Sequence, residues 1–153
     1  MELLAGELAG GSLDVSSAGT HGFTDHAMDD TTAASLKARG EPFAAFRSRR
    51  LSIDLVDGAD LVLTAEAVHR QFVLEEHPAA FRKVFTLGQF AEAVRRNPNL
   101  SGRELVTAAG TRRPPSIPDH DVADPYGRGP DAAEAAAVMM EDLLRLIVPA
   151  LTP

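Results

Sequence analysis

Two kinds of pattern alternate along residues 59–95, whose sequence is ADLVLTAEAVHRQFVLEEHPAAFRKVFTLGQFAEAVR. Ala59–Thr64 is a nearly uninterrupted apolar run, which predicts a strand buried on both faces. Glu66–Glu76 carries apolar residues at helical spacing and ends before a proline. Lys83–Leu87 predicts a second strand, and Gln89–Arg95 a second helix. Repeated strand–helix units with short connections predict an α/β fold with helices flanking a parallel sheet, whose ligands bind at the carboxyl ends of the strands.

The residues before this stretch continue the alternation. Glu2–Ala9 has leucines on one face and is followed by two glycines, which predicts a short helix with a glycine stop. Leu13–Ser17 predicts a short strand. The next helix begins at an aspartate cap, Asp29 or Asp30, and runs through Arg39 to a stop at Gly40. A brief helix is expected around residues 53–56.

Three further segments follow the central stretch. Ser101–Ala108 is predicted as a helix, with Ser101 and Glu104 spaced as a capping box. Thr111–Pro130 is rich in proline, and we expect either an ordered functional loop or a flexible one. Asp131–Leu151 is predicted as the longest helix.

Composition limits the possible functions. The 153 residues are 44% hydrophobic and 24% charged, as expected for one domain spanning residues 1–153. The formal net charge is −7 and no cluster of basic residues offsets it, so nucleic-acid binding is not expected. No apolar run is long enough to span a bilayer, and no secretion signal is visible, so we expect no membrane association and a cytoplasmic location.

The sequence lacks the motifs of several known kinds of catalytic and cofactor-binding site. The chain has no cysteine, which excludes disulfides, thiolate metal sites and cysteine nucleophiles from it. No G-x-S-x-G elbow and no G-x-G-x-x-G loop occurs, and no aspartate ends a strand as a phospho-accepting receiver domain requires. Histidines are not paired at helical spacing, and three consecutive residues such as Asp119–Asp121 rarely converge on one ion. We therefore expect neither a metal ion nor another cofactor.

A series of short segments recurs in a characteristic order: Val15–Thr20 (VSSAGT), Arg49–Leu51, Ala59–Thr64, Val84–Leu87 and Asp124–Tyr126 (DPY) before the last helix. In this series the chain resembles the bacterial low-molecular-weight protein tyrosine phosphatases over essentially its whole length. The resemblance implies their α/β fold and hydrolysis of phosphotyrosine in proteins without a cofactor.

One part of the family pattern is absent from this sequence. The family's C-x5-R-S/T phosphate loop and the strand before it have no counterpart, and Met1 falls near where that loop would end. Two explanations fit, a start codon assigned too late or a truncated paralogue, and we favour the first. The absent central strand would lie between Leu13–Ser17 and Asp60–Thr64. We therefore expect marginal stability, self-association through exposed strand edges, or direct pairing of those two segments.

The resemblance also assigns roles to three residues. Asp124 matches the general acid that protonates the leaving phenolate, although an Asp-Pro pair can simply start a turn. Tyr126 matches a residue lining the substrate crevice, or is an exposed loop aromatic. Ser17 matches a serine that supports the phosphate loop, or is an ordinary strand-end serine. Arg49 and Arg50 are interpreted as a solvated surface segment rather than a phosphate site.

These assignments predict the function of the chain as given. Without the thiolate nucleophile and the phosphate loop, we expect a phosphatase-family domain that does not hydrolyse phosphotyrosine. The alternative is a catalytically dead domain that binds a phosphoprotein or another protein partner.

Overall fold

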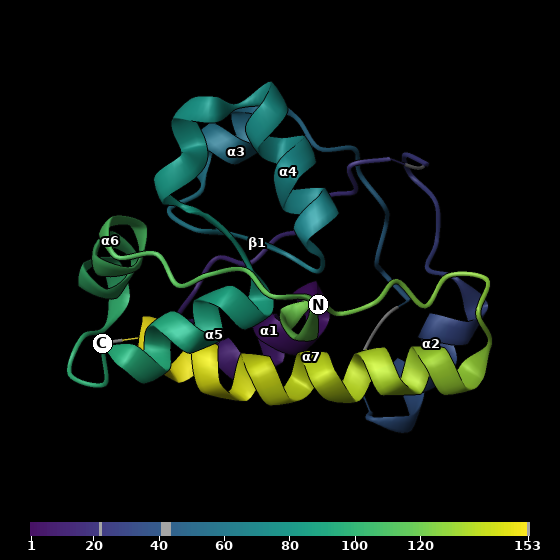
Figure 1. The fold of residues 1–153 in the computed structure, drawn as a ribbon. Helices are drawn as coiled ribbons and strands as arrows, with labels where there is room; N and C mark the ends of the chain where they lie inside the picture. Colours follow the sequence, from purple (N-terminus) through teal and green to yellow (C-terminus); the bar gives the residue numbers. More distant parts are fainter. Residues whose placement is uncertain (22, 41–43, 153) are drawn as a thin grey trace.

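A computed structural model describes residues 1–21, 23–40 and 44–152, and it shows an α/β fold in which helices surround a small parallel sheet (Figure 1). Strand β1 (Val62–Thr64) pairs in parallel with strand β2 (Val84–Thr86), and Val62 lies opposite Val84. The helices are α1 (Glu2–Ala9), α2 (Asp30–Ala38), α3 (Ile53–Gly58), α4 (Ala67–Glu76), α5 (Leu87–Arg96), α6 (Gly102–Thr111) and α7 (Pro130–Leu151), with 3₁₀ turns η1 (Pro78–Arg82) and η2 (Pro118–His120). The predicted fold class is confirmed.

The helices lie where the spacing of apolar residues predicts them, but one predicted helix cap is wrong. Asp29 caps α2 by accepting hydrogen bonds from the backbone of Thr31 and Thr32. Ser101, in contrast, makes no capping bond, so the predicted capping box is wrong. Ser101 has the extended backbone of an N-cap residue, but Gly102, the first residue of α6, has φ +52°, outside the helical region.

The predicted strand at Leu13–Ser17 is also wrong. Its side chains alternate as expected, with Leu13, Val15 and Ser17 half-buried and the two residues between them exposed, but the segment forms no ladder. The nearest pairing is an isolated parallel bridge between Gly19 and Arg50. A strand exists only with a hydrogen-bonded neighbour, and in the described residues none lies beside this segment.

The strand predicted at Ala59–Thr64 is shorter and less buried than expected. Ladder pairing begins only at Val62, and Val62 and Leu63 are half-buried, whereas all of β2 is buried. Within the described ranges β1 pairs with β2 alone, so direct pairing of β1 with Leu13–Ser17 does not occur. Self-association through the free edge of β1 stays a prediction.

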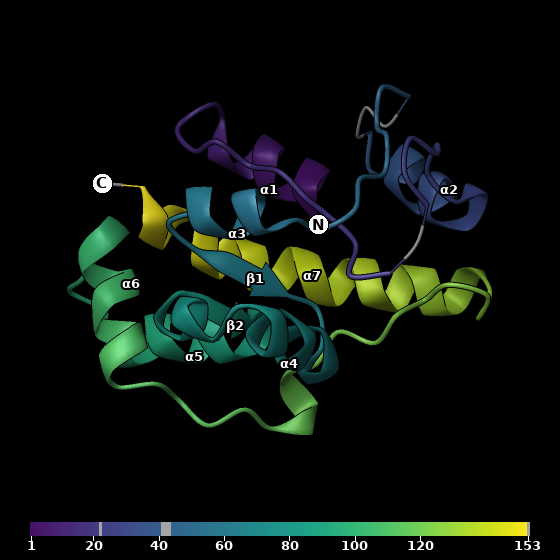
Figure 2. The same ribbon diagram turned by 90° about the horizontal axis from the view of Figure 1, so that it is seen from above.

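Most of the packing is between helices. Helix α7 runs along the molecule with α1 and α2 on one side and α5 on the other (Figure 2). The main core joins these helices to the sheet, and the rings of Phe85 and Phe90 meet edge to face at 5.3 Å in it. A second, smaller cluster lies between the sheet and the α3–α4 layer. Burial of each large apolar side chain contributes roughly 1.5–3 kcal/mol.

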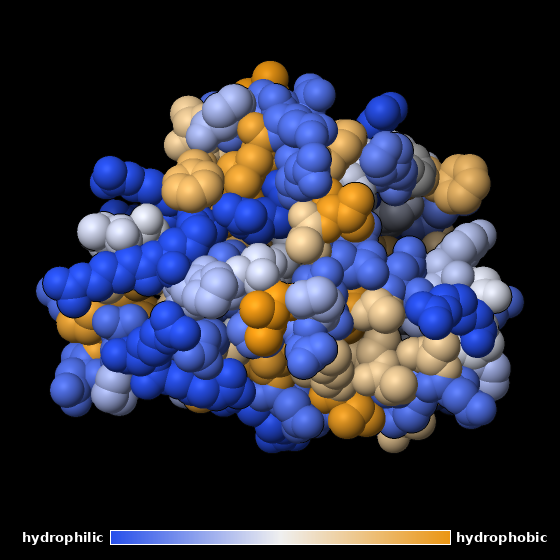
Figure 3. Space-filling view, in the orientation of Figure 1, coloured by the Kyte–Doolittle hydropathy of each residue, from blue (hydrophilic) through white to orange (hydrophobic). Residues whose placement is uncertain are grey.

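Apolar side chains also remain at the surface. Figure 3 shows them along the lower part, over α7, and in the layer of α3 and α4, among hydrophilic neighbours. Ile53, Val68 and Val138 are each more than 40% exposed, at 58%, 63% and 46%. No helix in the described part of the chain is both long enough and apolar enough to cross a membrane.

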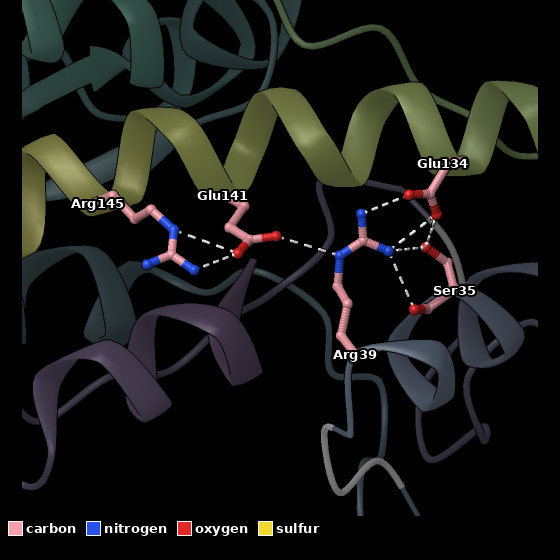
Figure 4. A network of polar contacts seen from close by, with 5 residues as sticks. All are labelled: Ser35, Arg39, Glu134, Glu141 and Arg145. Atoms are coloured by element: carbon pink, nitrogen blue, oxygen red, sulfur yellow. Dashed lines mark hydrogen bonds and ion pairs between the residues drawn. The ribbon is translucent and has the colours of Figure 1, made fainter.

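A polar network fastens α2 to α7 (Figure 4). The Arg39 guanidinium, 16% exposed, donates through both Nη atoms to Glu134 at 2.8 and 2.7 Å and through Nε to Glu141 at 3.3 Å. Ser35 also donates to Glu134, and Arg145 to Glu141. The Arg39 and Ser35 hydrogen bonds lower the pKa of Glu134 to about 2.

This network makes stability depend on acid. The pKa of Glu134 is lower in the folded state than its ordinary value of 4.5, so its stabilising effect is complete above pH 4.5 and is lost as the pH falls towards 2. The free energy of unfolding should therefore differ most between wild type and Glu134→Gln above pH 4.5, and the difference should shrink towards pH 2. Urea denaturation across this range measures it.

Glu104→Gln is the matched control, since Glu104 is exposed and makes no ion pair within the described residues. A difference between wild type and Glu134→Gln that stays constant with pH would show that the charge of Glu134 contributes nothing to the attachment of α2.

Candidate functional site

Ser17 lies beside the start of α1. Its Oγ donates a hydrogen bond of 2.5 Å to Oε2 of Glu2, in the first turn of that helix. Met1 packs against the main core, and burial lowers the pKa of its amino group. Figures 1 and 2 place this end of the chain in the middle of the molecule, over α7. Ser17 therefore supports the beginning of α1.

Asp124 and Tyr126 lie on an exposed turn before α7. The backbone N–H of Tyr126 donates to Oδ1 of Asp124 at 3.0 Å, and the N–H of Arg128 donates to the carbonyl of Pro125 at 3.0 Å. Asp124 is exposed, and Tyr126 is 70% exposed. Both side chains are thus open to a ligand arriving from solvent. Within the described residues, no hydrogen bond joins either of them to Ser17.

The loop that carries Asp124 is ordered by three contacts just before it. Val122 is buried, and its N–H donates to the carbonyl of Ala65 at 2.9 Å. The Asp121 carboxylate accepts a hydrogen bond of 3.0 Å from the N–H of Ala67, at the start of α4. Asp121 therefore caps α4 from a distant loop. In the part of the chain that the structure describes, no three His, Asp or Glu side chains gather as metal ligands.

The third contact is between η2 and α5. A Cβ built on Gly88 would lie 2.6 Å from the Cβ and the carbonyl oxygen of His120. Only glycine allows this approach, because real Cβ atoms do not come so close to other heavy atoms. This contact could not be predicted from the sequence, because Gly88 and His120 are distant in the chain.

A shallow groove lies beside the end of the VSSAGT segment and was not predicted. It is lined by Thr20 and His21 on one side and by α4 on the other, and the rings of His21 and Phe72 are 4.9 Å apart. Phe72, one of the apolar residues at helical spacing in α4, is half-buried and lines this groove. Tertiary packing of residues 20–21 on α4 creates the groove.

Comparison with known proteins identifies the family. The sequence profile of the low molecular weight phosphotyrosine protein phosphatases matches residues 3–100, and the chain belongs to this family. No protein with a curated description matches significantly.

Solved structures of similar fold cover nearly the whole chain. The tyrosine phosphatase AmsI of Erwinia amylovora has 21% identity and a TM-score of 0.76, with 99% of this chain and 83% of that chain covered. The arginine phosphatase YwlE of Geobacillus stearothermophilus has 25% identity and a TM-score of 0.74, with 98% and 84% covered. The tyrosine phosphatase Wzb of Escherichia coli K30, in complex with sulphate, has 19% identity and a TM-score of 0.75, with 98% and 86% covered. The C-terminal part of this chain, which includes Asp124, therefore lies within the shared fold.

The close approach at Gly88 predicts a stability effect. Gly88→Ala should destabilise the protein by about 1–3 kcal/mol, because the added methyl group overlaps the backbone of His120. Gly58→Ala is the control, since a Cβ there meets nothing within 4 Å, and it should leave stability unchanged or raise it by up to about 1 kcal/mol. Urea denaturation of the two variants measures both. Equal stabilities would show that η2 does not press on α5.

Proposed function

We propose that this chain is a phosphatase-family domain that retains the proton donor of phosphotyrosine hydrolysis and does not hydrolyse phosphate monoesters by itself. The observation that carries this proposal is the absence of cysteine from all 153 residues. In the thiol mechanism a thiolate attacks phosphorus, the bond from phosphorus to the phenolic oxygen breaks, and an acid gives its proton to that oxygen. Without a thiolate the first bond does not form.

We assign the acid role to Asp124. Its exposed carboxyl lies on a loop fixed by Val122 and Asp121, and an acid must be positioned as well as reachable. Tyr126 would face the aromatic ring of a phosphotyrosine, and its exposure leaves that ring face free. Ser17 would support a phosphate loop from its place beside the first turn of α1.

The proposed ligand is a phosphotyrosine protein. The similarity to the AmsI and Wzb tyrosine phosphatases supports phosphotyrosine, and the similarity to the YwlE arginine phosphatase makes phosphoarginine the comparison substrate. A cytoplasmic, bacterial origin is proposed with it, on the composition of the chain and on the bacterial sources of those three structures.

The alternative is a domain that only binds a phosphoprotein or another protein. The exposed turn of Asp124 and Tyr126 would then be a recognition surface. Titration with a phosphotyrosine peptide tests it: saturable binding that the unphosphorylated peptide lacks would favour this alternative.

The chain should show no measurable hydrolysis of an aryl phosphate. The physical reason is that an acid accelerates departure of a leaving group only when a nucleophile attacks the phosphorus. A colorimetric assay of p-nitrophenyl phosphate at neutral pH measures this. Turnover that disappears in Asp124→Asn would contradict the proposal, because it would show a complete site that uses Asp124 without a thiol.

The role of Asp124 can be tested by adding what the chain lacks. A chimera carrying a relative's apolar strand and C-x5-R-S loop before Met1 should hydrolyse aryl phosphates. Asp124→Asn in this chimera should lower kcat by about 10²–10⁴, the usual contribution of a general acid. Asp119→Asn, at an exposed aspartate of the same loop, is the matched control and should leave kcat unchanged. An active chimera that is indifferent to Asp124→Asn would remove the assignment.

A further inference from the structure

Two arginines meet at one backbone oxygen on β2. Nε of Arg70, from α4, and Nη1 of Arg113, from the segment after α6, both donate to the carbonyl of Val84, at 3.3 and 2.8 Å. Arg113 also donates to Oε1 of Gln89 at 3.4 Å and, through Nη2, to the carbonyl of Phe81. The two guanidinium groups are therefore held beside each other by neutral acceptors.

Aromatic rings cover the Arg113 guanidinium. Its Cζ lies 4.3 Å from the ring centre of Phe81 and 4.1 Å from that of Phe85. The Cζ of Arg70 lies 5.7 Å from the ring centre of Phe81. Phe85 is buried, whereas Phe81 is 48% exposed, so the arginine pair lies beside an aromatic ring that is partly open to solvent.

Within the described residues this pair has no counter-charge. Every ion pair in the described ranges involves other cations, and no carboxylate there lies within 4 Å of Arg70 or Arg113. Burial, and secondarily the charge of Arg70, lower the pKa of Arg113 to about 10. Nε of Arg113 is buried without a hydrogen-bond partner. Partly buried like charges are costly unless an anion pairs with them.

We propose that Arg70 and Arg113 form a binding site for an oxyanion group, phosphate or carboxylate, beside the exposed ring of Phe81. Both Nη atoms of Arg70 make no hydrogen bond within the described residues, and Nη2 of Arg113 has a second N–H besides the one given to Phe81. Guanidinium groups bind the oxygens of phosphates and carboxylates through such paired donors. The aromatic face would contact an apolar part of the ligand.

The site is separate from the proposed phosphotyrosine site, since it uses neither Ser17 nor Asp124. The net charge of −7 repels anions from the molecule as a whole, so anion binding here depends on this local pair. Arg113 ties Phe81, Val84 and Gln89 together and its replacement would also disturb the fold, so Arg70 is the residue to change.

The proposal is tested by titrating the full chain with inorganic phosphate in an isothermal titration calorimeter. A titration with sodium chloride of matched ionic strength is the reference. Wild type should bind phosphate saturably, and Arg70→Gln should weaken the affinity at least tenfold, the effect of losing one charge-assisted hydrogen bond. Arg103→Gln removes the same charge from a side chain that is 86% exposed, and should leave the affinity unchanged. Equal affinities for wild type and Arg70→Gln would overturn the site.

A spectroscopic measurement on the unaltered protein covers the case in which Arg70→Gln does not fold. Phosphate should shift the ¹H–¹⁵N resonance of the Arg113 Nε–H along a saturable curve, while chloride of equal ionic strength should not. Acetate in a parallel titration separates carboxylate from phosphate: a shift with either anion supports the site and identifies its ligand group. If neither phosphate nor acetate shifts this resonance, the proposal is overturned.

Discussion

Helix α7 buries an apolar stripe against helices from the N-terminal part and from the middle of the chain. Its buried residues include Leu144, Ile147 and Val148, and α1, α2, α5 and α6 all contact it. The two strands contribute only three residues each, so the sheet alone offers few hydrogen bonds to organise the fold. Because the hydrophobic contribution scales with apolar area removed from water, the buried residues of the helices around α7 contribute strongly to stability. The helices form the packed core, and the sheet positions the loops that follow its strands.

This division explains which elements could be predicted from the sequence. Helix signals are local, since apolar spacing, an aspartate cap and a glycine stop all lie within one segment, and α1, α2 and α7 form where those signals are. A strand signal is incomplete without a partner elsewhere in the chain. Leu13–Ser17 keeps the alternating burial of a strand but forms no ladder. The alternating pattern indicates which of its side chains face the core, but it does not indicate which strand, if any, pairs with the segment.

The contacts made by the site residues could also not be predicted from the sequence, because their partners lie elsewhere in the chain. The resemblance selected Asp124, Tyr126 and Ser17, and the structure shows what each one touches. Asp121 was considered only as a poor metal ligand, yet it caps α4 across more than fifty residues of chain. Arg113 gave no signal, because its position between Phe81 and Phe85 depends on how the segment after α6 returns to the sheet. Residues brought together by a fold are visible only when the fold is known.

The two candidate functions place opposite demands on Asp124. A general acid contributes about 10²–10⁴ in rate, whereas an oriented nucleophile contributes far more, since effective molarities reach about 10⁵–10⁸ M. Under the proposed function, the absence of a thiol from the sequence therefore outweighs the acid role proposed for Asp124. In a domain that only binds phosphoproteins, a carboxylate facing the phosphoryl group would repel it and weaken binding. The carboxylate of Asp124 also accepts the backbone N–H of Tyr126 and so shapes the turn. Because a carboxylate repels a phosphoryl group, the proposed descent from an active phosphatase site accounts for this aspartate better than a surface for phosphate binding alone.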